Sequence, residues 1–354
     1  MSSWSNRTLP RRRDLSQVPE EFRPVVVPRA FQPLIVESEA YQPKPEPVFD
    51  QLMSSPAARG GPKNEIIYPS RGGPVSSSSS QGAPVYLPSI QPPSPSAKEL
   101  TLADGSTVVF VILRNLRQQR DNELWIQSYN SIRKFYTNPI KIIDDNSSIN
   151  TVNGRLVNTE IIYSDFNGAG EILPYYYFVM KKWADRMIFL HDSMFLNRPF
   201  RPAELEGRVK MHWYFEGNGF DNDTKVQTYL SVLKNRDGLA AYLSVPHHEW
   251  RGCFGGASMI DLDVAEQLEE KYNLFSKPII MIRTRADREA FERFFGKVLF
   301  FEGLVTAATC SMNGDILRYP NAFEPMMDLS VDKVATLVSQ RGYDTPILKV
   351  WRGR

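Results

Sequence analysis

The order of apolar and polar segments after residue 100 predicts strands that alternate with helices. Residues 106–114 (STVVFVILR) and 140–147 (IKIIDDNS) are runs of strand length, and the second ends in polar residues. Between them, apolar residues recur with the period of one helix face, namely Trp125, Tyr129, Ile132 and Tyr136. Strand, helix and strand of this length predict a βαβ unit with parallel strands.

The same pattern then repeats along the chain. Residues 159–164 (TEIIYS) predict a third strand, residues 170–183 a helix entered through a glycine-rich turn, and residues 186–196 a fourth strand. Parallel sheets covered by helices on both faces bind ligands at the carboxyl ends of their strands. We therefore expect an α/β fold with a mixed, mainly parallel sheet flanked by helices, in which the polar residues after the second and fourth strands converge.

The pattern beyond residue 198 is less regular. Residues 209–215 predict a strand, residues 238–245 a helix or a strand, and residues 256–262 a short strand followed by a helix near Asp263. A helix is expected to start near Arg285 and to be followed by a short strand that ends at Phe301. Residues 330–341 predict a small helix that packs back on the sheet.

The first 98 residues differ in composition from the rest of the chain. They hold 17 of the 26 prolines and the run SSSSS, and their apolar residues come in short bursts without a sustained period. Such a segment buries too little surface to offset its chain entropy. We predict a disordered arm over residues 1–98, which is a possible tether for a partner, and one folded domain over residues 99–354.

Charge and cysteine content narrow the classes of function. Residues 1–98 carry a net charge of +3 and the remainder −1, so the predicted domain has no electrostatic footprint for nucleic acid. No run of 18 apolar residues predicts a transmembrane helix, and no apolar segment follows the basic N-terminus as in a signal peptide. With only Cys253 and Cys310, a reducing compartment is the default. A cytoplasmic location is therefore expected.

Two carboxylates follow the second predicted strand. Asp144 and Asp145 stand where a carboxylate can accept hydrogen bonds from a base or a ribose hydroxyl, which suits a nucleotide site. The alternative is a capping or Asx turn before the following NSS.

The fourth predicted strand, MIFLHDSMFL, is interrupted by three polar residues. Burying an unpaired carboxylate is costly, so His191, Asp192 and Ser193 should lie where the strand meets solvent, a metal or a ligand. Asp192 suits a divalent cation in phosphate chemistry. His191 would be a second metal ligand or a hydrogen-bond donor to the phosphate. The alternative is a buried triplet whose hydrogen bonds are made by neighbouring backbone.

Two further segments carry candidate chemistry. The turn GCFGG permits close approach of backbone at Gly255 and Gly256, as a sugar or phosphate pocket requires, although any tight turn uses glycine. Arg285, Asp287, Arg288, Glu289 and Glu292 lie within two turns of the helix that starts near Arg285. Arg288 and Glu292 have the spacing of an ordinary surface pair, but a carboxylate near a pocket can also act as general base.

A metallohydrolase is a further alternative. His247, His248 and Glu249 would supply metal ligands, together with His191, Asp192 and His212. Adjacent histidines point to opposite sides of a strand, however, and no HExxH motif is present. The sequence also lacks GxSxG, P-loop and GxGxxG motifs, which disfavours serine hydrolases, P-loop NTPases and classical dinucleotide enzymes.

The order of VVFVILR, amphipathic helix, IKIIDDNSS, DRMIFLHDSMFL and WRGCFGGASMIDL resembles glycosyltransferases of the GT-A fold. It is most similar to the glycosyltransferase-like proteins of large DNA viruses and some protists. The resemblance covers residues 106–301. It implies a nucleotide-sugar donor, a hydroxyl acceptor and a Mn²⁺ or Mg²⁺ ion held by Asp192. The family normally has Asp-x-Asp at this position, and here only one carboxylate remains.

The resemblance also assigns roles to residues of the nucleotide and sugar sites. It implies that Arg114 and Asp144 or Asp145 bind the base and ribose, while His191 stands in the altered Asp-x-Asp segment. The glycine-rich turn after a tryptophan is similar to the segment that shapes the sugar pocket, which implies roles for three residues: Trp250, Gly255 and Gly256. Asp287 or Glu292 is the implied base.

Two functions from different classes follow from these observations. The first is a glycosyltransferase that moves a sugar from a nucleotide diphosphate to a hydroxyl acceptor. The second is a non-catalytic protein that keeps the fold as an interaction or structural module, for example in a virus particle. The missing second carboxylate favours the module, whereas polar residues at several strand ends favour the enzyme.

Overall fold

The described structure is a computed structural model and covers residues 88–118, 121–149, 154–216, 223–244, 250–319 and 330–350. Most of the predicted arm, residues 1–87, lies outside these ranges, so its disorder stays a prediction. Residues 88–98 lie within them and contact helix α1 (Asn122–Phe135). Ser94 N and Lys98 N donate to the carbonyls of Arg133 and Phe135.

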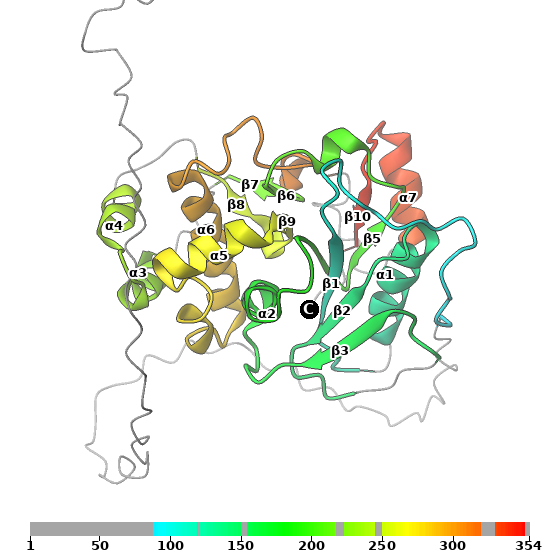
Figure 1. The fold of residues 1–354 in the computed structure, drawn as a ribbon, viewed down its shortest axis with the longest axis horizontal. Coiled ribbons are helices and arrows are strands. Elements are labelled where there is room, and N and C mark those ends of the chain that lie inside the picture. The colour runs from blue at the N-terminus through cyan, green and yellow to red at the C-terminus, as the bar shows by residue number, and fades with distance from the viewer. Residues whose placement is uncertain are drawn as a thin grey trace, which may run out of the picture. The chain divides into compact units, whose positions relative to one another are not determined.

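A six-stranded sheet in the order β3-β2-β1-β4-β9-β6 forms the centre of the fold (Figure 1). Strands β3, β2, β1 and β4 are parallel, and β9 is antiparallel to both of its neighbours. The strands are β1 (Val108–Arg114), β2 (Ile140–Asp144), β3 (Thr159–Tyr163), β4 (Arg186–His191), β6 (Val209–Met211) and β9 (Ser258–Asp261). The predicted mixed, mainly parallel sheet is confirmed.

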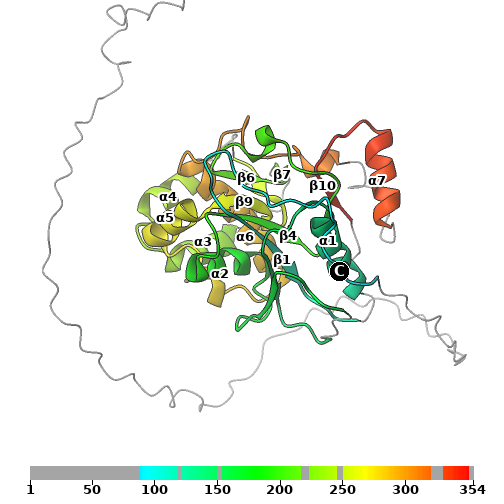
Figure 2. The same ribbon diagram turned by 45° about the vertical axis from the view of Figure 1, so that its right-hand side comes forward.

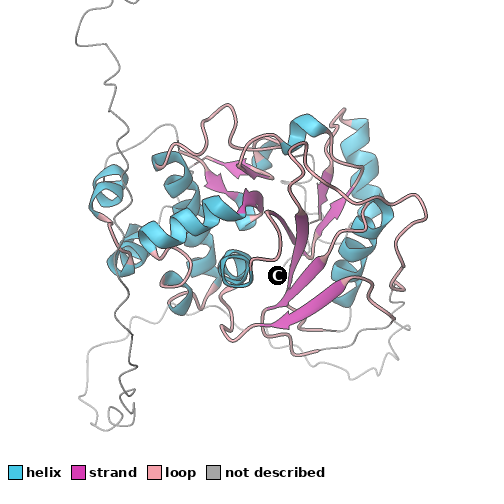
Figure 3. Ribbon diagram, viewed as in Figure 1, coloured by secondary structure: helices cyan, strands magenta, loops and turns pink. Residues whose placement is uncertain are grey.

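Helices cover both faces of this sheet, which explains why the first six residues of β1 are apolar. All seven residues of β1 are buried. On one side lies α1 (Asn122–Phe135), and on the other lie α2 (Leu173–Lys181), α5 (Leu262–Tyr272) and α6 (Arg285–Phe301) (Figures 1 and 3). The predicted apolar face of α1 is confirmed, because Trp125, Tyr129 and Ile132 are fully buried.

The fourth predicted strand is in fact two strands. A turn at Asp192 and Ser193 separates β4 from β5 (Met194–Leu196). Strand β5 leaves the central sheet and pairs antiparallel with β10 (Ile347–Lys349). Helix α7 (Val331–Gln340) packs on β10, and it lies on the same side of the central sheet as α1 (Figure 2). The polar triplet therefore marks a change of partner strand.

Several later elements differ from the sequence-based expectation. Helix α6 continues through Phe301, so the short strand expected there was wrong; its apolar residues keep helical spacing and are buried. The strand expected over residues 209–215 divides into β6 and β7 (Tyr214–Phe215), and β7 pairs with β8 (Gly252–Cys253). Residues 223–243 form two helices, α3 (Asp223–Val232) and α4 (Asp237–Leu243).

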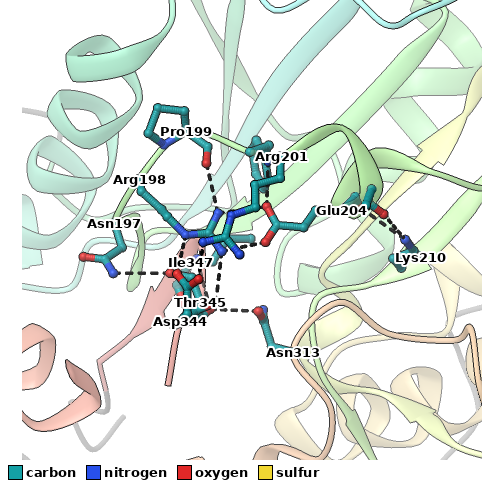
Figure 4. A network of polar contacts seen from close by, with 12 residues as sticks. Asn197, Arg198, Pro199, Arg201, Glu204, Lys210, Asn313, Asp344, Thr345 and Ile347 are labelled. Carbon is teal, nitrogen blue, oxygen red and sulfur yellow. Dashed lines mark hydrogen bonds and ion pairs between the residues drawn. The ribbon is translucent and has the colours of Figure 1, made fainter. Parts of the chain in front are cut away.

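A polar network holds the segment before β10 against the segment after β5 (Figure 4). The Arg198 guanidinium lies between two carboxylates, with Nε 2.7 Å from Asp344 Oδ1 and Nη2 2.6 Å from Glu204 Oε1. Arg201 also pairs with Asp344. Asn197 N donates to the carbonyl of Pro346 at 2.8 Å. Strand β10 is therefore anchored by side chains as well as by its ladder.

No helix in the described ranges has both the length and the apolar character that crossing a membrane requires.

Candidate functional site

The candidate site lies where the carboxyl ends of β1 and β4 meet. From β1 the chain moves to β2 and β3 on one side, whereas β4 lies on the other side of β1. Such a reversal of strand order opens a crevice in which α/β proteins bind ligands. Leu113 of β1 is paired with His191 of β4, and Asp192 N donates to the Leu113 carbonyl at 3.0 Å.

Arg114 and Asp144 form a buried ion pair at the ends of β1 and β2. The distance from Arg114 Nε to Asp144 Oδ2 is 2.7 Å, and both side chains are almost fully buried. The Arg114 guanidinium lies 4.8 Å above the Trp125 ring, and Asp144 Oδ1 accepts a hydrogen bond from Ser147 N. The pair fixes the ends of two neighbouring strands, and its predicted nucleotide contacts stay predictions.

Asp145 organises the loop that precedes α2. Its carboxylate accepts hydrogen bonds from Gly168 N at 2.6 Å and Gly170 N at 3.1 Å. Burial raises the pKa of Asp145, although the two backbone donors oppose that shift. Asp145 thus orders the glycine-rich entrance to α2, and Glu171 follows directly in that entrance.

The predicted polar triplet lies at the turn after β4. The His191 ring stacks on Phe189, and its Nε2 lies 2.5 Å from the Gly255 carbonyl oxygen, which makes Nε2 the donor. Asp192 is 4% exposed. Ser193 Oγ accepts a hydrogen bond from Lys349 Nζ on β10. The triplet therefore connects β4 to the glycine turn and to the last strand.

The predicted glycine turn needs both of its glycines. Gly255 and Gly256 have φ values of 62° and 60°, in the left-handed region. A β-carbon at Gly255 would lie 2.7 Å from His191 Nε2, and one at Gly256 would lie 3.0 Å from Glu171 Cβ. The two residues thus allow backbone to approach His191 and Glu171 closely.

Two glutamates beside this turn interact electrostatically, Glu171 and Glu292. Glu292 lies on α6, and the backbone N–H of Gly255 favours the ionised form of its carboxylate. Burial raises the pKa of Glu171 to about 7, against the opposing charge of Arg288. Burial, and then repulsion by Glu171, raises the pKa of Glu292 to about 8. The pair therefore takes up and releases protons near neutral pH as a unit.

Arg288 partly balances the charge of the pair. Its Nε lies 3.3 Å from Glu171 Oε2, and its Nη1 donates to the Gly168 carbonyl at 3.2 Å. The arginine predicted as one half of a possible surface pair with Glu292 thus pairs with the loop before α2. Gly170, at φ 58°, lies where a β-carbon would overlap the Arg288 side chain.

Asp287, the other acidic residue predicted as a base, has a different environment. It is the third residue of a capping box at the start of α6, and its Oδ2 accepts hydrogen bonds from Thr284 N and Oγ1 at 2.8 and 2.7 Å. Its Oδ1 pairs with Lys225. Burial opposes ionisation, but these bonds outweigh it and hold the pKa of Asp287 well below its usual range.

The remaining predicted residues are not joined to this cluster by a described contact. The Trp250 ring lies 4.1 Å from Lys297 Nζ, one turn or more beyond Glu292 along α6. His212 is fully buried, its Nε2 is 2.8 Å from the Phe189 carbonyl, and burial lowers its pKa to about 4. His247, His248 and Glu249 lie outside the described residues.

The residues at the turn after β4 do not fit a divalent metal. Asp192 is the one carboxylate of the triplet, Ser193 Oγ is bonded to the ammonium of Lys349, and His191 Nε2 is used by Gly255. A lysine ammonium beside a proposed ligand opposes cation binding. Within the described ranges, no three His, Cys, Asp or Glu side chains are grouped so that they could hold an ion.

Sequence reasoning missed Glu171 and Lys349, and it did not place Arg288 in the site. The signal for Glu171 is its position directly after the glycine-rich turn that precedes α2. Lys349 lies beyond the range of the GT-A resemblance, and nothing local in ILKV indicates a functional lysine. Arg288 had the spacing of a surface residue, and only the position of the loop before α2 shows its partner.

A surface depression of about 520 Å³ lies elsewhere, between α5 and the end of α6. Two of its charged residues, Lys271 and Glu302, pair with each other at 2.8 Å. It contains none of the strand-end residues, so we do not assign it to the site.

Comparison with known proteins adds a remote structural likeness. No protein-family model and no curated protein matches the chain. Among solved structures, the chain is similar to residues 1–349 of TarS from S. aureus, with a TM-score of 0.29 and 11% identity. The match covers 52% of this chain and 55% of that one, about half the length of each. A likeness of this size carries no argument about function.

Proposed function

We propose that this protein transfers a sugar from a nucleotide diphosphate to a hydroxyl acceptor. The observation that carries the proposal is the pair of carboxylates, Glu171 and Glu292, held with raised pKa values beside the glycine turn. Carboxyl groups with perturbed pKa values are typical of active sites, and α/β proteins bind ligands at the carboxyl ends of their parallel strands. The GT-A resemblance of residues 106–301 supports the same reaction.

The donor is proposed to lie across the ends of β1, β2 and β4. Its nucleotide would lie near the Arg114–Asp144 pair and Asp145. Its sugar would lie beside the turn of Gly255 and Gly256, next to His191 and Glu171. Trp250 contacts Lys297 and is proposed to border the acceptor side of the sugar pocket.

Glu292 is our proposed base, in preference to Asp287. A base must take a proton, and a carboxylate whose pKa is raised to about 8 does so more readily than one held by a cap and a lysine. The acceptor oxygen attacks the anomeric carbon while its proton passes to Glu292. The bond between that carbon and the diphosphate oxygen breaks, and its electron pair leaves with the diphosphate.

Glu171 and Arg288 are proposed as positioning residues. Glu171 raises the pKa of Glu292 by repulsion, and Arg288 limits this effect by its pairing with Glu171. Because Asp145 and Arg288 both bind the Gly168–Gly170 loop, Glu171 is set in place from two sides. Preorganised charges of this kind lower barriers without reorganisation during the reaction.

The test uses the full chain with a panel of UDP-, GDP- and CDP-sugars. Release of nucleoside diphosphate is measured with and without simple alcohol acceptors, in EDTA and in Mn²⁺. We expect slow donor hydrolysis with one nucleotide class and faster release when an acceptor is present. A folded protein that neither releases diphosphate nor binds any of the nucleotides would overturn the proposal.

A non-catalytic interaction module is the second candidate. The observation in its favour is that Arg114 and Asp144 bind each other, as residues of a retired nucleotide site would. The same panel separates the two functions, because a module would show neither nucleotide binding nor diphosphate release.

A further inference from the structure

A lysine from the last strand reaches the candidate site. Lys349 ends β10 and is 9% exposed, and its Nζ donates to Ser193 Oγ at 2.5 Å. Ser193 belongs to the turn after β4, so the ammonium stands at the carboxyl end of the parallel strands. Its charge also acts on Glu171, whose pKa it lowers.

The backbone around Lys349 is fixed on both sides. Lys349 N donates to the Tyr319 hydroxyl at 3.0 Å, and Val350 N donates to the Ser193 carbonyl at 3.0 Å. The network of Arg198, Glu204 and Asp344 holds the segment before the strand (Figure 4). A buried lysine whose position is set in advance loses little further freedom when it binds an anion.

The proposed transfer reaction creates negative charge, which an ammonium nearby would stabilise. The diphosphate gains negative charge as its bond to the sugar breaks, at the same strand ends. The set of groups around Ser193 does not fit a divalent cation, whereas Lys349 already supplies a positive charge there. Lysine is a common point-charge ligand of phosphate.

We propose that Lys349 contacts the diphosphate of the donor and stabilises its charge during bond breaking, in the position where a divalent metal would otherwise act. This inference rests on the function proposed above. Lys349 donates hydrogen bonds to diphosphate oxygens and transfers no proton. Binding of nucleoside diphosphate is therefore independent of divalent metal.

The experiment measures binding of matched pairs, UDP with UMP, GDP with GMP and CDP with CMP, to the full chain by calorimetry in EDTA. In the wild type we expect the diphosphate of one pair to bind, with an affinity changed less than threefold by Mn²⁺ or Mg²⁺. Lys349→Met should weaken diphosphate binding at least tenfold and change monophosphate binding less than threefold. Lys349→Arg should restore part of the loss.

The matched control is Lys271→Met, which removes the same charge from the remote Lys271–Glu302 pair. It should leave both affinities unchanged. Equal weakening of mono- and diphosphate by Lys349→Met would indicate a structural role and overturn the inference. The wild-type metal dependence needs no variant, so the inference is tested even if Lys349→Met fails to fold.

The outcomes also separate this inference from the proposed function. Diphosphate binding or donor cleavage that requires Mn²⁺ or Mg²⁺ would overturn the role of Lys349 and leave glycosyl transfer standing. No binding of any nucleotide under either condition would overturn both.

Discussion

The first turn and the middle of helix α6 place two acidic residues in opposite environments. At Asp287, backbone donors, a threonine hydroxyl and Lys225 surround the carboxylate, and its pKa falls. At Glu292, burial and then repulsion by the Glu171 carboxylate raise the pKa. The two residues are only five positions apart in the chain.

The difference teaches how a charged side chain can be assigned to stability or to chemistry. A carboxylate whose lone pairs are all used stabilises the fold and has little to offer a substrate. A carboxylate that is buried beside another carries an electrostatic cost, which proteins retain where a reaction needs it. The following predictions test this contrast, beginning with the largest expected effect.

Replacing Glu292 should have the largest effect, on catalysis. Glu292→Gln should lower the rate of sugar transfer by about 10²–10⁴-fold, the usual contribution of a positioned base. Glu289→Gln is the matched control on the same helix, because Glu289 is 46% exposed and pairs with Arg285. Initial rates of diphosphate release measure both. Equal rates in the two variants would remove Glu292 from the mechanism.

Adding a methyl group to the turn beside Glu292 should have the next largest effect, on stability. Gly255→Ala combines a left-handed backbone, which costs about 1–2 kcal/mol for alanine, with contact against the His191 ring. We expect a loss of about 2–3 kcal/mol in the free energy of unfolding, measured in urea. Gly303→Ala, at φ 64° in open space, should show the backbone cost alone. Similar losses in the two variants would contradict close packing at Gly255.

Asp287 should affect stability more than catalysis. Asp287→Asn removes the ion pair with Lys225 and weakens the capping box, at a cost of about 1–2 kcal/mol. For a domain of this size, the melting temperature should fall by about 3–6 °C. Transfer measured well below that temperature should stay within threefold of the wild type. A large loss of rate at unchanged stability would reverse our choice of base.

The pH dependence of stability should be the smallest effect. Glu171 and Glu292 have folded pKa values above the usual 4.5. Their stabilising contribution to the free energy of unfolding is therefore complete below pH 4.5 and is lost as pH rises toward about 8. His212 has a folded pKa of about 4, so its contribution to the free energy of unfolding has the opposite pH dependence. That contribution is complete above pH 6.5 and is lost as pH falls toward 4.

Between pH 6.5 and 8 the two glutamates therefore dominate among these groups. We expect the free energy of unfolding to fall by about 1 kcal/mol over that window, after allowance for partial exposure. Glu292→Gln should flatten the decline in a pH series of urea titrations. A variant that declines as steeply as the wild type would contradict the raised pKa of Glu292.

Local sequence pattern predicted the elements whose contacts are close in the chain. The run of β1, the face of α1 and the polar ends of β2 and β4 all follow from residues a few positions apart. The pattern failed at VLFF in α6, because four apolar residues fit a strand and a buried helix equally well.

The site could be predicted only in part, because its groups meet through distant contacts. Asp287 and Glu292 look equivalent in the sequence, and only the position of Glu171 and Lys225 distinguishes them. Lys349 enters from a strand 156 positions beyond Ser193. The turn at Asp192 and Ser193 was visible as a polar interruption, but the new partner strand of β5 was not.

The pairing of β5 with β10 has a consequence for the order in which the protein folds. The parallel core joins segments that follow one another closely, whereas β5 and β10 must close a loop of roughly 150 residues, as the Ser193–Lys349 separation of 156 shows. Contacts of such long range are expected to form late. We expect the amides of β10 to exchange with solvent sooner than those of β1, since peripheral units open before a core.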